Sequence, residues 1–182
     1  MNAIAVTQHW LEHAVIGLNL CPFAKAVQVK QQIRWVESTA SDAHGLLDDL
    51  VHELQYLAAA DPEAVDTTLL IHPHALTDFL DYNEFLDIAD AAVEKLGLAG
   101  VLQVASFHPE YQFEGTSPGD VENLSNRSPY PMLHLLREDS IARAVANFPD
   151  TAVIYERNIE TLRQLGAHGW RLLLSSTSPT GH

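Results

Sequence analysis

The side chains best suited to chemistry gather between His108 and Arg137, in the stretch HPEYQFEGTSPGDVENLSNRSPYPMLHLLR. The first part of this stretch is about twice as long as an ordinary connection, which is unusual in a compact domain unless the connection binds something or is disordered. Disordered segments lack large apolar side chains, whereas this one contains Tyr111, Phe113 and Tyr130. The sequence therefore predicts an ordered, functional loop.

The end of this loop has the features of an anion site. Asn126, Arg127 and Ser128 precede an expected helix that starts at Pro129 and continues to about Ala146. Backbone N–H groups and the positive end of the helix dipole would then lie beside a guanidinium, a combination that attracts phosphate or carboxylate. The pattern indicates a small anionic ligand.

Three polar residues of this expected helix share one side of it. Tyr130, His134 and Arg137 are spaced by four and three residues, which places them on one face of a helix. They could therefore face one ligand together. In the alternative interpretation, Arg137 pairs with an acid such as Glu138 or Asp139, and His134 packs against the core.

Histidines also follow two expected strands. The segments LLIHPH and VASFHP place His72, His74 and His108 directly after strand-like runs. If these strands are parallel, the histidines emerge at the carboxyl edge of the sheet, where open α/β folds bind ligands. Imidazoles act as acids and bases near neutral pH or as metal ligands, so these residues and Glu110 are candidate metal ligands. In the alternative, the histidines only end the strands and are solvated.

The common cofactor and metal motifs are absent from the sequence. The chain contains no HExxH, paired CxxC, calcium-loop, GxGxxG, P-loop or GxSxG pattern. Nucleotide enzymes of the common kinds are therefore disfavoured. No cofactor is identified and no metal is assigned, because a metal site would rest on scattered histidines alone.

The only cysteine, Cys21, lies in the segment NLCPFAK near the start of the chain. If Pro22 opens a helix, Cys21 occupies its N-cap, where the helix terminus favours the thiolate and hence nucleophilic or redox chemistry. His108 or His134 would then be the basic partner of a Cys–His pair. The alternative is a small buried apolar residue, which is what an isolated cysteine usually is.

The bulk composition limits the classes of partner. The chain has 182 residues, of which 47% are apolar, enough for one domain with a full core. Its formal net charge of -14 disfavours nucleic acid and anionic membranes as partners, since both attract Lys and Arg. A single cysteine, no signal-peptide pattern and no bilayer-length apolar stretch indicate a cytoplasmic protein. The oligomeric state is left open.

Hydrophobic periodicity predicts helices and strands in alternation. Such alternation favours an α/β domain over residues 1–174, with a small, mainly parallel sheet flanked by helices and a loose tail at 175–182. A two-layer α+β sandwich is the alternative. Ser41 or Thr39 is the expected cap of the second helix. The expected helices lie at about 7–20, 41–61, 77–97, 129–146 and 158–166, and the expected strands lie at 33–37, 67–71 and 101–107, with 151–155 and 170–174 as further candidates.

Three segments together are similar to a known family: WLEHAVIGLNLCPFAK, FHPEYQF and NRSPYPMLHLLREDS. They resemble an uncharacterised bacterial family catalogued as domain of unknown function 1415, and the resemblance covers about residues 7 to 166. It implies a small cytosolic bacterial protein and brings no activity, substrate or catalytic residue. The residues themselves must therefore support the functional interpretation.

The leading hypothesis is a small-molecule enzyme or ligand-binding domain for an anionic metabolite. Arg127 and Arg137 would hold the anion. His108 and His134 would act as acid–base groups, with Cys21 as the nucleophile. The alternatives are a non-catalytic domain whose aromatic loop docks a partner chain and a histidine-based metal-binding protein. The remaining candidates would orient polar groups or form the apolar wall of the site: Asn19, Asn123, Asn126, Ser128, Tyr130, Tyr111 and Phe113.

Overall fold

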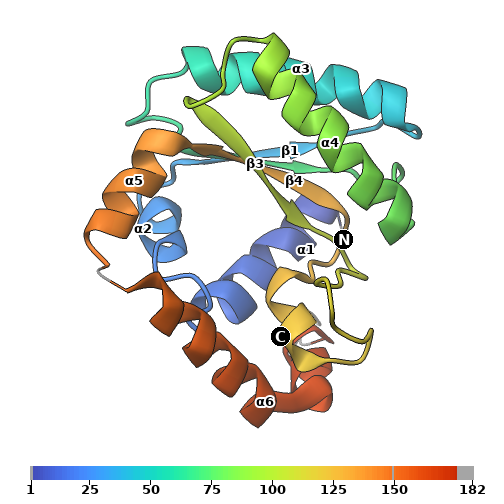
Figure 1. Ribbon diagram of the computed structural model, residues 1–182, viewed down its shortest axis with the longest axis vertical. Helices are drawn as coiled ribbons and strands as arrows, with labels where there is room; N and C mark the ends of the chain where they lie inside the picture. The colour runs from blue at the N-terminus through green and yellow to red at the C-terminus, as the bar shows by residue number, and fades with distance from the viewer. Residues whose placement is uncertain (1, 149, 176–182) are drawn as a thin grey trace, which may run out of the picture.

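Four strands form a sheet at the centre of the computed structural model, which describes residues 2–148 and 150–175 (Figure 1). The strands are β1 (Ile33–Glu37), β2 (Thr67–Ile71), β3 (Leu102–Phe107) and β4 (Met132–Arg137). Their order across the sheet is β1-β2-β4-β3. β1 pairs with β2 in parallel, whereas β4 runs antiparallel to both β2 and β3. The sheet is therefore mixed: β1, β2 and β3 share one direction, and β4 lies between two of them in the opposite direction.

Helices cover both faces of this sheet. They are α1 (Ala3–Trp10), the π-helical η1 (Leu11–Ile16), α2 (Ala24–Val29), α3 (Ala43–Ala59), α4 (Phe79–Lys95), the 3-10 helix η2 (Val121–Asn126), α5 (Glu138–Ala146) and α6 (Thr151–Ser175). α3 and α4 lie on one side of the sheet, and α1, α2 and α6 lie on the other (Figure 1). The predicted α/β class, with one sheet flanked by helices, is confirmed.

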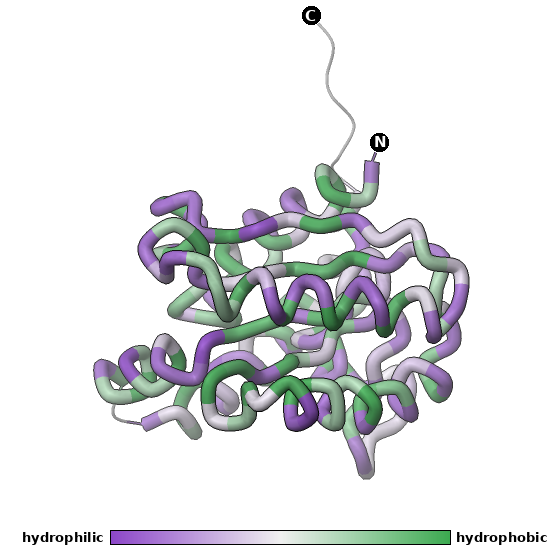
Figure 2. The backbone as a smooth tube through the Cα atoms, turned by 90° about the horizontal axis from the view of Figure 1, so that it is seen from above, coloured by the Kyte–Doolittle hydropathy of each residue, from purple (hydrophilic) through white to green (hydrophobic). Residues whose placement is uncertain are grey.

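The face under α3 and α4 is a closed core. Leu70, Leu133 and Leu135 project from the strands into a buried cluster with α3 and α4, and all three are fully buried. Both helices are amphipathic, as the alternation of hydrophobic and hydrophilic residues along the helical turns in Figure 2 illustrates. Burying a leucine side chain contributes about 2 kcal/mol relative to leaving it exposed, so this face anchors the sheet.

The opposite face is covered by α1, η1 and α6. Trp10 and Ala14 pack there with Leu162 and Trp170 of α6, so the two ends of the described chain meet over the sheet. The sheet residues in this second cluster alternate with those of the first, as the period of two in a strand requires. They are Leu69, Ile71 and Met132, with Ile33, Trp35 and Phe107 packed beside them.

Helix capping follows the sequence with one shift. The side chain of Asp78 accepts the backbone N–H groups of Leu80 and Asp81 and begins α4, close to residue 77, where the helix was expected to start. Gly97 follows the same helix with φ of 71°, a conformation that glycine adopts without strain. The cap of α3 is Asp42, one residue after the expected Ser41, because its carboxylate accepts the Gly45 N–H at 2.8 Å.

The segment after Tyr130 is a strand, so the prediction of a helix from Pro129 to Ala146 is wrong in its first half. β4 pairs with β2 on one side and β3 on the other, and this pairing satisfies its backbone groups on both edges. The helix begins only at Glu138, as α5. His134 and Arg137 therefore point to opposite faces of the sheet, since residues three apart in a strand do not share a side.

The last part of the chain is helical, and the candidate strands at 151–155 and 170–174 are wrong. Both segments belong to α6, whose Leu162 and Trp170 are buried against the second face. Gly166, with φ of 67° and ψ of 171°, interrupts the helix where the expected short helix was to end. Of the predicted loose tail, Ser175 ends α6, and residues 176–182 lie outside the described residues.

Candidate functional site

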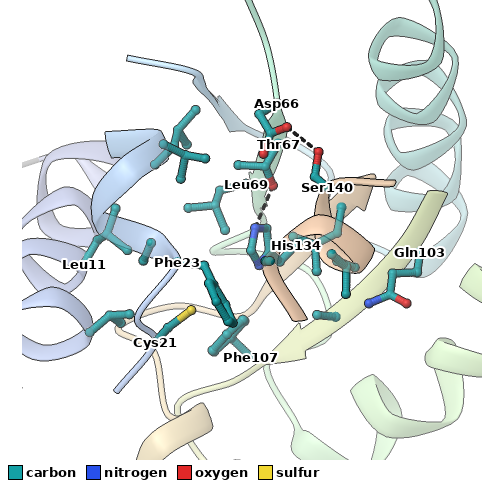
Figure 3. A pocket seen from close by; sticks show the side chains of 18 of the residues that line it. Leu11, Cys21, Phe23, Asp66, Thr67, Leu69, Gln103, Phe107, His134 and Ser140 are labelled. Atoms are coloured by element: carbon teal, nitrogen blue, oxygen red, sulfur yellow. Dashed lines mark hydrogen bonds between the residues drawn. The ribbon is translucent and has the colours of Figure 1, made fainter. Parts of the chain in front are cut away.

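A pocket of about 360 Å³ lies on the second face of the sheet, between η1, α2, α5 and the strands (Figure 3). We call it the sheet pocket. α5 has no buried residue, so this part of the face is covered more loosely than the rest. The polar lining residues are Cys21, Asp66, Thr67, Gln103, His134 and Ser140. The apolar lining residues are Trp10, Leu11, Val15, Phe23, Ala24, Val27, Ile33, Leu69, Ala105, Phe107, Leu136, Ile141 and Ala144.

The ring of His134 is held in one tautomer by its neighbour on β2. Thr67 Oγ1 donates its hydrogen to the Leu135 carbonyl at 2.6 Å. The 2.7 Å contact between Thr67 Oγ1 and His134 Nε2 must then be a bond that Nε2–H donates (Figure 3). A neutral imidazole with its proton on Nε2 carries a lone pair on Nδ1. His134 is therefore positioned as an acceptor, or as a base, through Nδ1.

Nothing in the described part of the chain uses this lone pair. The hydrogen bonds of His134 end at Nε2, and its ring otherwise contacts Phe107, with ring centroids 6.1 Å apart. Burial lowers the pKa of His134 to about 4, so the ring is neutral at about pH 7. An uncharged nitrogen with a free lone pair beside an empty volume is able to accept a hydrogen bond or a proton from a molecule that enters this volume.

Cys21 lines the same pocket from the turn between η1 and α2. It is partly buried, and no hydrogen bond joins its thiol to His134 or His108 among the described residues. The prediction that Cys21 caps a helix is wrong, because α2 begins at Ala24 and its N-cap is Phe23. The structure thus brings Cys21 and His134 into one pocket without forming a Cys–His pair.

Asn19 shapes this turn instead of lining the pocket. Its φ of 52° is in the left-handed region, which asparagine tolerates better than most residues. Its side chain is exposed, and its backbone N–H donates to the Ile16 carbonyl at 3.0 Å. Asn19 therefore contributes by directing the chain toward Cys21.

Further polar groups of the lining come from Ser140, Asp66 and Trp10. Ser140 Oγ donates to Asp66 Oδ1 at 2.6 Å, which ties the start of α5 to the start of β2. Trp10 is almost fully buried, and its indole Nε1–H has no acceptor among the described residues. A buried N–H without a partner is rare, which distinguishes this group from the other polar groups of the lining.

The long loop is ordered, as predicted, by hydrogen bonds between its own residues. Asn123 is fully buried, and its Oδ1 accepts the Phe113 N–H and the Thr116 hydroxyl, both at 2.9 Å. Its Nδ2 donates to the Ser117 carbonyl at 2.8 Å. The rings of Tyr111 and Phe113 meet edge to face with centroids 4.9 Å apart, and both side chains are half-buried rather than exposed as a patch. Asn123 therefore organises the loop, and nothing in these contacts shows a ligand.

The remaining loop candidates also make structural contacts. Arg127 donates from Nε to the Tyr111 carbonyl at 3.1 Å and from Nη2 to the Pro118 carbonyl at 2.7 Å. Asn126 Nδ2 donates to the Ser106 carbonyl at 3.1 Å. The Ser128 hydroxyl donates to the Tyr130 carbonyl at 2.6 Å. The Asn126 bond fastens the loop to β3, whereas Arg127 joins two parts of the loop and lies outside the lining of the sheet pocket.

Arg137 is a second structural arginine. Its guanidinium is buried and donates from Nη2 to the carbonyls of Ala60 at 3.1 Å and Val65 at 2.8 Å. It binds neither Glu138 nor Asp139 among the ion pairs of the described residues. The structure therefore does not bring Arg137 together with Arg127 or with His134.

His72 and His108 lie together beside α4, as their positions after two codirectional strands predict. Both rings contact the ring of Tyr82, at 5.8 Å and 5.0 Å; we call these three residues the histidine cluster. Both are fully buried, and burial lowers the pKa of both histidines, to about 4 for His72. His74, in contrast, is exposed.

The histidine cluster is packed rather than open. His108 donates from Nε2 to the Leu76 carbonyl at 3.1 Å and accepts the Glu110 N–H on Nδ1 at 3.0 Å, so both ring nitrogens are used. His72 donates from Nδ1 to the Ala75 carbonyl at 2.8 Å, and its Nε2 has no partner within the described chain. Across residues 2–148 and 150–175, no group of three or more His, Cys, Asp or Glu is placed to hold a metal ion.

The sequence interpretation missed most of the pocket. Thr67, Asp66, Ser140 and the aromatic walls Phe23 and Phe107 were not singled out, because their convergence depends on β4 being a strand. The β4 sequence MLHLLR does not alternate cleanly between apolar and polar residues, so its pattern alone does not place His134 on the sheet face where it pairs with Ala105. In the described part of the chain, no helix is long and apolar enough to cross a bilayer.

The fold and the pocket define an α/β protein with one mixed sheet and a largely apolar cavity on one of its faces. Residues 2–172 match the family described as "Protein of unknown function (DUF1415)", and the chain belongs to this family. The resemblance of the three sequence segments is thereby confirmed. No curated protein and no solved structure gives a significant match.

Proposed function

We propose that this protein binds a small, mainly apolar molecule in the sheet pocket, with His134 as its polar anchor. The observation that supports this most is the free Nδ1 of a neutral, tautomerically fixed His134 beside an empty volume of about 360 Å³. An apolar cavity of about 150 Å³ already binds benzene. The sheet pocket therefore has room for a body of about two fused rings.

The surroundings of His134 fit such a ligand. The lining is dominated by aliphatic and aromatic side chains with a few polar groups, which is the usual composition of small-molecule sites. The buried Trp10 N–H would gain an acceptor if the ligand or an accompanying water supplied an oxygen. An anionic metabolite held by Arg127 and Arg137 has less support, because both guanidiniums already bind backbone carbonyls.

Filling the pocket tests this proposal. Ala105 is the cross-strand neighbour of His134 and lines the pocket, so Ala105→Phe would occupy the space beside the imidazole. The matched control is Ala91→Phe, at an exposed alanine of α4 outside this lining. In a thermal-shift and NMR screen with two-ring aromatic fragments, wild type and the control should bind and Ala105→Phe should not. Equal binding by all three proteins would refute the proposed site.

Catalysis in the same pocket is the second candidate, favoured by the presence of Cys21 beside a neutral His134. The Cys21 sulfur would attack an ester carbonyl, the alkoxide or phenolate would leave, and the thiol proton would pass to His134 Nδ1. Incubation with p-nitrophenyl acetate should then acetylate Cys21 in wild type and much more slowly in His134→Leu. Equal acetylation rates would leave the pocket as a binding site alone.

We also propose that the protein works in the cytoplasm. Cys21 is a free thiol, and a reducing compartment keeps thiols in this state. Fractionation of cells that express the chain should recover it with cytoplasmic markers. Recovery with periplasmic or membrane markers would refute this.

A further inference from the structure

At one end of the sheet pocket, the hydroxyl groups already donate their hydrogens to other groups of the protein. Figure 3 shows Asp66, Thr67 and Ser140 gathered on one side of His134, with Cys21 and Phe107 on the other. The Thr67 hydroxyl donates to the Leu135 carbonyl, and the Ser140 hydroxyl donates to Asp66. What this end offers to a guest is therefore acceptors: the lone pair on His134 Nδ1 and the Asp66 carboxylate.

The lining of the pocket carries no positive charge of its own. No Arg or Lys belongs to it, and its titratable residues are Cys21, Asp66 and His134. The exposed Arg143 lies behind this end and donates from Nη2 to Ser140 Oγ at 3.2 Å. Gln103 and Trp10 are the lining side chains whose N–H groups form no hydrogen bond in the described structure, and both are neutral. An anionic head would thus meet a lone pair and a carboxylate in a setting of low dielectric, which costs free energy.

We propose that the guest of the sheet pocket is an apolar molecule with a hydrogen-bond donor head, a hydroxyl or an amine, which donates to His134 Nδ1. This inference rests on the proposed function, since it names the class of molecule that the pocket selects. Carboxylates and phosphates fit this pocket less well, because its lining contains no Arg or Lys and His134 would have to be protonated to donate to them. Burial opposes that protonation.

A set of probes with one common body tests the head group. 2-Naphthol and 2-naphthylmethylamine carry a neutral and a cationic donor, 2-methoxynaphthalene lacks the donor, and 2-naphthoate is an anion. Titration of the wild-type protein at about pH 7, followed by NMR, compares their dissociation constants. One hydrogen bond to a buried nitrogen should favour the donors over the ether by roughly threefold to tenfold.

The ratio of the dissociation constants of 2-naphthol and 2-naphthylmethylamine shows which group of the pocket recognises the head. Tighter binding of the amine would mean that the Asp66 carboxylate adds to the attraction, and tighter binding of the naphthol would mean that His134 acts alone; both support a donor head. In His134→Leu the preference of 2-naphthol over 2-methoxynaphthalene should disappear. The Ala91→Phe control should keep it.

Three outcomes would overturn the inference, and they differ in what they say about the proposed function. Equal affinity for all four probes, blocked by Ala105→Phe, would leave the binding site standing and refute the donor head. Tightest binding of 2-naphthoate would do the same and restore the anion hypothesis. Binding of no probe, with identical spectra for wild type and Ala105→Phe in their presence, would refute the proposed function and the inference with it.

Discussion

The buried histidines on the two faces of the sheet differ in how their ring nitrogens are hydrogen-bonded. Beside α4, His72 and His108 are enclosed with Tyr82, and three of their four ring nitrogens form hydrogen bonds to the backbone. On the other face, His134 uses one nitrogen to bind Thr67 and turns the other toward an empty volume. All three imidazoles have lowered pKa values caused by burial.

This comparison shows that a shifted pKa does not by itself separate function from structure. Burial lowers a histidine pKa whether the ring is packed or waits for a ligand. The two regions differ in whether the ring nitrogens already form hydrogen bonds and in whether a cavity lies beside them. Ring nitrogens that are hydrogen-bonded in a filled core stabilise the fold, whereas a nitrogen without a hydrogen bond beside a cavity can bind a ligand.

Neighbouring leucines on β2 give the largest expected contrast between the faces. Leu70→Ala removes a fully buried side chain from the closed core and should cost about 2–5 kcal/mol of unfolding free energy. Leu69 points to the pocket face and lines the cavity. Part of its side-chain surface therefore contacts no other atoms, and shortening the side chain removes fewer packing contacts. Leu69→Ala should cost less by at least about 1 kcal/mol. Urea unfolding of both variants measures this, and an equal or reversed order would contradict the contrast between a filled and a hollow face.

Replacing single histidines should separate stability from binding. His108→Leu leaves the Leu76 carbonyl and the Glu110 N–H without their partner and should destabilise the fold by about 2–3 kcal/mol. His134→Leu leaves the Thr67 hydroxyl bonded to the Leu135 carbonyl, so about 1 kcal/mol or less is expected. Unfolding curves and probe titrations of both variants test this. The distinction fails if His134→Leu is the less stable protein or still prefers donor-headed probes.

The response to acid gives the smallest contrast. The folded-state pKa of His72 and of His134 is about 4, below the ordinary histidine value of about 6.5, so the unfolded chain binds more protons. The stability that these neutral rings contribute is present above about pH 6.5 and is lost as the pH falls toward about 4. His134→Leu should reduce the slope of stability against pH in this window by up to about 1.4 kcal/mol per unit.

The exposed His74 provides the control for this slope. His74→Leu removes an exposed histidine that belongs to neither site, and the loss of slope in His134→Leu is measured against this variant. A wild-type protein whose stability is constant between about pH 6.5 and 4 would contradict the low pKa values on both faces.

The first two thirds of the fold could be predicted from local pattern. Leu46, Leu50, Leu54 and Leu57 recur at helical spacing and form the buried side of α3, and the continuous apolar run TTLLI is the fully buried β2. Such periodicity reflects which side of an element faces the core, so it survives without knowledge of the partners.

The conformations of β4 and α6 could not be predicted from hydrophobic periodicity. The sequence MLHLLR consists mostly of good helix formers, and its strand conformation depends on pairing with β2 and β3, which are remote along the chain. α6 contains β-branched and aromatic residues, and its helix is stabilised by Leu162 and Trp170 against the second face. In both cases tertiary contacts override local propensity.

The candidate site was predicted in part, through residue type. Cys21 and His134 were chosen because thiols and imidazoles do chemistry, and the structure places both in the sheet pocket. Arg127 and Arg137 were chosen on charge, but each guanidinium is used by nearby backbone carbonyls. A sequence shows which groups are reactive, and only a structure shows which of them are already engaged.

The central claim, that His134 presents a free Nδ1 to the sheet pocket, is tested most directly by a long-range ¹H–¹⁵N correlation spectrum of its imidazole. At about pH 7 the proton should reside on Nε2, Nδ1 should resonate as an unprotonated nitrogen, and its shift should move when 2-naphthol is added. A proton on Nδ1, an imidazolium ring at this pH, or an Nδ1 signal that does not respond to saturating 2-naphthol would contradict it.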